Sequence, residues 1–287
     1  MNRFIKNIAL TVLASIPAIV AVYAIIFIFQ FNFTGLAGEV FYSIEKAGHN
    51  SGLPAVILGD SVCNQLWNQR EDSLNIAHLG CNQAITSAGT YLLLKKYLEH
   101  NPQTQEVFYI ICPQSLGNDL NLNYTYQYFV IPFFKGENVK LLDEDTTQKV
   151  YDRFGRFFAE NGLIKSVLLN NNLFMKRYLE HIKTKPAQIY TRRLSPTAAI
   201  YLPKIQELCA KHNAKLSVLP VPIPDTSENN DWDNFRKDVK AFGLYEVLGN
   251  FTEKIHYCPA DWFGDGVHFK PDILAQHLQE LRNAVIH

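Results

Sequence analysis

The chain lacks an excess of charge of either sign. Its 287 residues include 27 Lys and Arg and 27 Asp and Glu, so the formal net charge is zero. Proteins that hold nucleic acids through the phosphate backbone usually carry a basic patch or stripe. No nucleic-acid partner is therefore expected. The hydrophobic and charged fractions, 47% and 19%, are those of an ordinary globular protein.

Cysteines are few and widely spaced. There are five, at Cys63, Cys81, Cys112, Cys209 and Cys258. No two of them form the C-x-x-C pair typical of zinc sites, so no zinc site is expected. No other metal or cofactor is predicted. Buried, reduced thiols are the favoured interpretation. A disulfide between Cys63 and Cys81 is the alternative.

Charge is also absent from one long stretch near the N-terminus. From Ile8 to Phe31 no residue is charged, and about 20 apolar residues suffice to cross a membrane as a helix. Arg3 and Lys6 precede this stretch, and the next acidic residue is Glu39. Because positive flanks stay in the cytoplasm, the remainder of the chain is expected on the outer side.

A cleaved signal peptide is the alternative for this N-terminus. Its apolar region would be shorter and would end in small residues before a cleavage site. Here the apolar run continues through "YAIIFIFQFNF". We therefore predict a short cytoplasmic tip and an uncleaved signal anchor at 1–31, and a juxtamembrane connector at 32–52.

Beyond the connector, short apolar runs alternate with stretches of helical spacing. This alternation predicts an α/β fold with a doubly wound parallel sheet. The predicted strands are 54–59, 74–80, 106–113 and 214–221, and the predicted helices are 84–100, 197–212, 232–242 and 271–286.

The alternation stops between about 119 and 195, a segment too long for a simple connection. It contains the aromatic run "NLNYTYQYFVIPFF" and a mostly helical part at 146–183. Two interpretations stay open. The insertion is either a lid or partner surface, whose aromatic residues 124–134 would stack on sugars or dock a membrane protein, or additional core.

Ser61 follows the first predicted strand directly, in "VILGDSV". Ligands bind at the carboxyl ends of the strands in open α/β sheets. A serine there becomes a nucleophile when a histidine takes its proton and a carboxylate orients the histidine. Asp265 and His268, three residues apart before the last helix, supply both groups. The alternatives are a helix-capping Ser61 and an Asp–His contact within a loop.

Acyl transfer at Ser61 would also need donors for a developing oxyanion. The backbone N–H of Ser61, the N–H of Gly80 at the end of the second strand and a side-chain amide are the candidates. A glycine at position 80 lets the backbone approach a ligand closely.

"GDSV", "GCNQAITSAG", "LGND" and "DGVH" occur in that order. In this pattern, residues 53–287 resemble the SGNH (GDSL-type) hydrolases. The resemblance implies a flavodoxin-like three-layer α/β/α domain with a Ser-His-Asp triad. By motif, Ser61 is the nucleophile, Gly80 the glycine of the second block, and Asp265 and His268 complete the triad.

The third block departs from the family pattern. Family members usually show G-x-N-D directly after the strand. Here Gly117, Asn118 and Asp119 lack the intervening residue and lie several positions later. The resemblance makes Asn118 the predicted amide donor of the oxyanion hole, with Gln114 and Asn82 as alternatives.

The combination of a signal anchor with an SGNH-like domain resembles bacterial envelope proteins that modify polymers. The resemblance implies a single-pass protein of the bacterial cytoplasmic (inner) membrane with a periplasmic catalytic domain. It further implies a serine O-acyltransferase. This enzyme would receive an acyl, typically acetyl, group on Ser61 from a multi-pass membrane-bound O-acyltransferase partner and pass it from the acyl-serine to an extracytoplasmic glycan. An esterase (deacetylase) with the same triad and a catalytically idle accessory protein are the alternatives.

Overall fold

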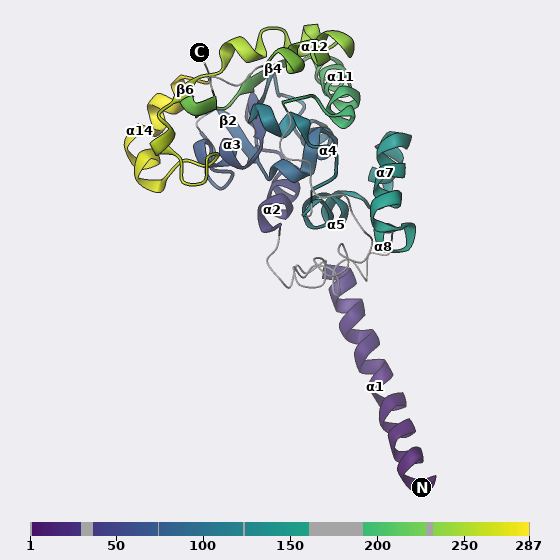
Figure 1. Ribbon diagram of the computed structural model, residues 1–287. Coiled ribbons are helices and arrows are strands. Elements are labelled where there is room, and N and C mark those ends of the chain that lie inside the picture. Colours follow the sequence, from purple (N-terminus) through teal and green to yellow (C-terminus); the bar gives the residue numbers. More distant parts are fainter. Residues whose placement is uncertain are drawn as a thin grey trace.

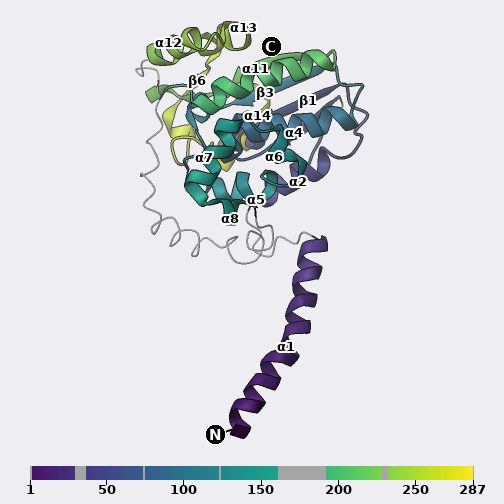
Figure 2. The same ribbon diagram turned by 90° about the vertical axis from the view of Figure 1, so that its right-hand side faces the viewer.

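A computed structural model describes residues 2–29, 37–73, 75–122, 124–160, 192–227 and 232–286. Its first helix, α1 (Asn2–Phe29), projects away from the rest of the chain in both views (Figures 1 and 2). Within α1, Arg3–Val22 has a mean hydropathy of 1.9 and none of it is buried, so it is long and apolar enough to cross a membrane. Residues 30 and 31 of the predicted anchor lie outside the described residues.

A sheet of four parallel strands forms the centre of the body. The strand order is β2-β1-β3-β4, which matches the first four positions of flavodoxin-like sheets. All four predicted strands are confirmed, as β1 (Ala55–Gly59), β2 (Ile76–Gly80), β3 (Glu106–Ile111) and β4 (Lys215–Pro220). The near-continuous apolar runs of β1, β2 and β3 follow from their burial in the sheet, whereas β4, at its edge, is only partly buried.

Helices cover both faces of this sheet (Figure 1). On one side α4 and α11 pack together, and on the other α3 contacts three strands and α14. The bounds are α3 (Ser61–Leu66), α4 (Thr86–His100), α11 (Pro196–Lys211), α12 (Asp233–Ala241), α13 (Tyr245–Leu248) and α14 (Pro271–Asn283). A pair of two-residue parallel strands, β5 (Ile223–Pro224) and β6 (Tyr257–Cys258), lies beside the main sheet. The prediction of an α/β fold with a parallel sheet is confirmed.

Part of the predicted connector is helical and belongs to the body. Helix α2 (Gly38–Lys46) packs against β2 and α4, with Val40 and Ser43 fully buried. Its Lys46 Nζ donates to the backbone carbonyls of Gln69 and His78. These contacts attach the segment that follows α1 to the sheet.

The aromatic insertion contributes core. Residues Tyr126–Val130 form a π-helical turn that continues into α5 (Ile131–Phe133), and helices α6 (Glu137–Leu141), α7 (Glu144–Phe154) and α8 (Arg156–Glu160) follow. Four aromatic side chains of this stretch are buried: Tyr126, Phe129, Phe133 and Phe134. These four rings therefore cannot stack on a sugar or dock a partner. Residues 161–191, which include the rest of the predicted helical part, lie outside the described residues.

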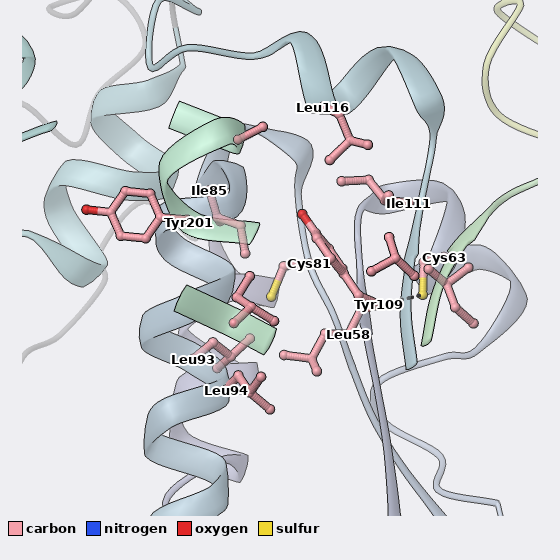
Figure 3. Close-up of a cluster of buried hydrophobic side chains, with 14 of the residues drawn as sticks. Leu58, Cys63, Cys81, Ile85, Leu93, Leu94, Tyr109, Ile111, Leu116 and Tyr201 are labelled. Atoms are coloured by element: carbon pink, nitrogen blue, oxygen red, sulfur yellow. Dashed lines mark hydrogen bonds between the residues drawn. The ribbon is translucent and has the colours of Figure 1, made fainter. Parts of the chain in front are cut away.

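All five cysteines are buried, and none forms a disulfide. Figure 3 shows Cys63 and Cys81 among apolar side chains that include Leu58 and Tyr109. Burial raises the pKa of the Cys81 thiol to about 12, so this sulfur stays protonated. The interpretation as buried thiols is confirmed, and the proposed Cys63–Cys81 disulfide is wrong.

Candidate active site

The turn between β1 and α3 holds Ser61 as the first residue of its helix. The N-cap is Asp60, whose Oδ1 accepts from the backbone N–H groups of Val62 (3.1 Å) and Cys63 (3.3 Å). Asp is among the preferred N-cap residues because its carboxylate pairs with these otherwise free donors. The interpretation of Ser61 as the helix cap is therefore wrong, and its hydroxyl is left for another contact.

The second oxygen of Asp60 ties this turn to the end of β3. Asp60 Oδ2 accepts from the Cys112 N–H and from the Ser115 hydroxyl, each at 2.8 Å. Burial raises the pKa of this carboxyl, which is 2% exposed, while the hydrogen bonds from Ser115 and the backbone lower it in part. The position of Asp60, one residue before a helix, is a capping signal in the sequence, but its contacts with Cys112 and Ser115 are visible only in the fold.

Two glycines allow the strands and α3 to approach closely. A Cβ on Gly59 would lie 1.9 Å from the carbonyl oxygen of Ile110 on β3, where there is no room for it. A Cβ on Gly80 would lie 3.0 Å from the Cα of Asn64 on α3. In the structure Gly80 makes room for α3, whereas the predicted close approach at this glycine is that of a ligand.

Ser61 and His268 meet although 207 residues separate them in the chain. Ser61 Oγ lies 2.8 Å from His268 Nε2, and His268 Nδ1 lies 2.8 Å from Asp265 Oδ2. A carboxylate only accepts hydrogen bonds, so Nδ1 carries the ring proton and Nε2 accepts from the Ser61 hydroxyl. The structure thus brings the three residues selected from the sequence into one hydrogen-bonded chain.

The loop that carries Asp265 and His268 is organised by the Asp265 carboxylate. Its Oδ1 accepts from the backbone N–H groups of Val267 (3.0 Å) and His268 (2.7 Å). Gly266, with φ of 78°, supplies the left-handed backbone that this tight turn requires. The D-G-V-H sequence therefore folds locally into a turn that points both side chains toward one another.

The same hydrogen bonds set the charge of Asp265. Desolvation alone would raise the pKa of this carboxyl. The backbone and ring of His268 and the N–H of Val267 outweigh it and lower the pKa to about 2. Asp265 is therefore ionised at neutral pH, as the orienting partner of a histidine base must be.

The predicted oxyanion donors differ in their existing contacts. Among the described residues the Ser61 N–H has no hydrogen-bond partner. Asn118 Nδ2, by contrast, lies 3.3 Å from Gln83 Oε1 and 3.4 Å from the Gln83 carbonyl. A substrate oxygen would therefore have to compete with Gln83 for a donor of this amide group.

The two alternative amide donors keep their N–H groups available. Asn82 Oδ1 accepts from the Ala84 N–H, and Gln114 Oε1 accepts from the Cys112 thiol. Within the described part of the chain, Asn82 Nδ2 and Gln114 Nε2 form no hydrogen bond. The choice among Asn118, Asn82 and Gln114 stays a prediction, as does the role of Gly80.

Asp119, beside Asn118 in the third motif, binds residues of two helices. Its Oδ1 accepts from Lys149 Nζ (2.8 Å) and from the Thr197 hydroxyl (2.6 Å) and N–H (3.1 Å). These contacts join α7 to the start of α11. Asp119 therefore stabilises the insertion and takes no part in the chain from Ser61 to Asp265.

Solvent reaches the Asp265–His268 pair. The two side chains are 61% and 38% exposed, respectively. In the segments that the structure describes, no three His, Cys, Asp or Glu side chains gather as a metal site. The site is an open serine–histidine–aspartate constellation at the carboxyl end of β1.

No protein-family model matches this chain, and no curated protein matches it. Among solved structures, a Streptococcus pneumoniae chain described as a candidate platelet activating factor is similar to it. The two share 10% identity with a TM-score of 0.37, over 91% of this chain and 95% of that one. At this identity and TM-score the likeness assigns neither a family nor an activity to this chain.

Proposed function

We propose that this protein is an SGNH-type serine enzyme that cleaves acyl esters through an acyl-Ser61 intermediate. The observation that supports this most is the 2.8 Å contact between Ser61 Oγ and His268 Nε2, with Asp265 behind the ring. A nucleophile, a base and an orienting carboxylate within hydrogen-bond reach are the signature of covalent acyl transfer.

In the proposed mechanism, Ser61 Oγ attacks the ester carbonyl while His268 Nε2 takes the hydroxyl proton. Asp265 keeps the ring in the required tautomer and stabilises the imidazolium that forms. The free Ser61 N–H, together with Gly80 and one of the amides, would donate to the oxyanion. His268 then returns its proton to the leaving alkoxide, and the acyl group stays on Ser61.

The acceptor decides between hydrolysis and transfer. His268 is accessible to solvent, so it can activate a water molecule to attack the acyl-serine. Transfer to a sugar hydroxyl would require a partner or acceptor that covers the site and excludes water. We therefore expect the isolated protein to act as an esterase.

Transfer to an extracytoplasmic glycan is the second candidate, and the apolar helix α1 favours it. A soluble esterase needs no anchor, whereas a 20-residue apolar span would hold the enzyme beside a membrane-bound acyl donor. In this proposal α1 lies in the bacterial cytoplasmic membrane and the body faces the periplasm. A multi-pass O-acyltransferase would supply the acyl group.

Labelling with a fluorophosphonate tests the serine. We expect the wild type to be labelled and to hydrolyse p-nitrophenyl acetate, and Ser61→Ala to do neither. Ser73→Ala is the matched control, because Ser73 Oγ also contacts a histidine, His78 Nε2 at 3.0 Å, whose Nδ1 faces a carbonyl rather than a carboxylate. Equal labelling of Ser61→Ala would show that another residue reacts and would refute Ser61 as the nucleophile. A folded wild type that is never labelled would favour the catalytically idle accessory protein.

Product analysis separates the two enzymatic candidates. Purified protein is incubated with an acetyl ester and a glycan acceptor, with and without membranes from the source cell. Release of acetate under all conditions identifies an esterase. Glycan acetylation that needs both membranes and Ser61 identifies an acyltransferase.

A further inference from the structure

The loop with Asp265 and His268 is closed by a short antiparallel bridge between Phe263 and Phe269. The Gly264 N–H donates to the His268 carbonyl (2.8 Å), and the Lys270 N–H donates to the Trp262 carbonyl (2.9 Å). The rings of Phe263 and Phe269 stack with centroids 4.5 Å apart. The backbone of Phe269 is therefore strand-like, with its own N–H and C=O on the edge opposite Phe263.

One side chain fills that opposite edge. Gln65 Oε1 accepts from the Phe269 N–H at 3.1 Å, and Gln65 Nε2 donates to the Phe269 carbonyl at 3.2 Å. Gln65 and Ser61 are four residues apart on α3, so they share one face of that helix. The amide takes the place of a neighbouring strand and pairs with the residue next to His268.

We propose that Gln65 is a positioning residue that holds the His268 loop on the nucleophile helix. This inference rests on the proposed function. Two hydrogen bonds to the residue beside His268 fix the loop relative to α3, and with it the distance between His268 Nε2 and Ser61 Oγ. A displacement of about 1 Å in such a pair can lower a rate on the order of 100-fold.

Glutamine is the side chain that best fits the backbone N–H and C=O groups of Phe269. The two partners on Phe269 are one donor and one acceptor, and a primary amide offers the complementary acceptor and donor at the correct spacing. An ionised glutamate could accept from the N–H but could not donate to the carbonyl. An asparagine is one methylene shorter.

Gln65→Met tests the proposal, because methionine is similar in length and makes neither hydrogen bond. We expect kcat for p-nitrophenyl acetate and the rate of fluorophosphonate labelling to fall about 10- to 100-fold. KM should stay within about 2-fold of the wild type, because both ends of the Gln65 amide are paired with the Phe269 backbone.

Arg282→Met is the matched control. Arg282 Nε donates to the Leu66 carbonyl at 2.6 Å, so this variant also removes a hydrogen bond between α3 and the C-terminal part. It should lower Tm and leave the labelling rate unchanged. Wild-type kcat and labelling in Gln65→Met, or equal kinetic losses in both variants, would overturn the proposal.

A readout without substrate separates this inference from the proposed function. If the wild type is never labelled, the proposed function fails. The positioning role of Gln65 is then tested by the far-downfield NMR resonance of the His268 Nδ1–H proton. That resonance should broaden through solvent exchange in Gln65→Met and persist in Arg282→Met. An unchanged resonance in Gln65→Met would refute the positioning role.

Discussion

The Asp265 carboxylate orients His268 only by accepting hydrogen bonds, from the ring Nδ1–H and from two backbone N–H groups. In Asp265→Asn the amide Oδ1 can keep the two backbone N–H groups, but its Nδ2 would donate to His268 Nδ1. The ring proton would then lie on Nε2, which could no longer accept from Ser61. We expect kcat for an acetyl ester to fall on the order of 10⁴-fold with the fold retained. Steady-state kinetics and circular dichroism measure the two effects, and a loss of less than about 10-fold would contradict the assigned role.

The low pKa of Asp265 also has a consequence for stability. The carboxyl titrates near 3.9 in an unfolded chain and near 2 in the fold. Its contribution to stability is therefore complete above about pH 4 and is lost as the pH falls through 2. Urea unfolding of the wild type and of Asp265→Asn should differ most above pH 4 and converge toward pH 2. A difference that stays constant down to pH 2 would contradict this linkage.

The individual residues of the site were predictable to different degrees. Ser61, Asp265 and His268 lie in short local patterns, and the tight turn of Asp265 depends only on the next three residues. The sequence does not reveal the full role of Asp60, because its second pair of donors, Cys112 and Ser115, comes from the turn after β3, more than 50 residues later. For Asn118, the contact with Gln83 depends on how two loops pack, which no local motif specifies.

At the scale of elements, Gly80 determines how closely α3 lies on β2. In Gly80→Ala the new methyl group would meet the Asn64 backbone at 3.0–3.1 Å, so α3 and Ser61 must shift. We expect a loss of about 1–3 kcal/mol in the free energy of unfolding, together with a lower kcat. Urea titration and ester hydrolysis measure both quantities.

Gly38→Ala is the control for this substitution. Gly38 begins α2, and no atom lies within 4 Å of its added Cβ. This variant should keep wild-type activity and gain up to about 1 kcal/mol of stability. If Gly80→Ala were as stable and active as Gly38→Ala, the close packing of α3 on β2 would not constrain the site.

The strands of the sheet and the helices that cover it were predictable, because buried apolar runs and helical spacing are local signals. The aromatic run 124–134 was ambiguous for a physical reason. Aromatic residues favour both core and ligand surfaces. Contacts with residues outside the run, such as Tyr126 with Phe154 of α7 at 5.2 Å between ring centroids, bury four of its rings. Residues far along the chain thus determine what a local composition means.

At the scale of the whole molecule, one general rule about parallel sheets predicts contacts between residues that are far apart in the chain. Parallel strands end at a common edge, so a serine after β1 is exposed to loops that return to that edge. This rule predicts that Ser61 and a late loop can meet. It does not specify which helix holds that loop in place, and the contact between Gln65 and Phe269 emerges only from the packed structure.

The orientation of the whole chain is open to a direct test. With Arg3 and Lys6 before the uncharged stretch that begins at Ile8, we expect the N-terminus inside and the body outside. All five native cysteines are buried, so an exposed introduced cysteine is the main target of a membrane-impermeant maleimide. In spheroplasts, Glu246→Cys on the exposed face of α13 should be labelled, and Asn2→Cys only after permeabilisation.

The reverse pattern would place the Ser61 site in the cytoplasm, where a periplasmic glycan cannot be its acceptor. Recovery of the protein in the soluble fraction would instead show that α1 does not anchor it.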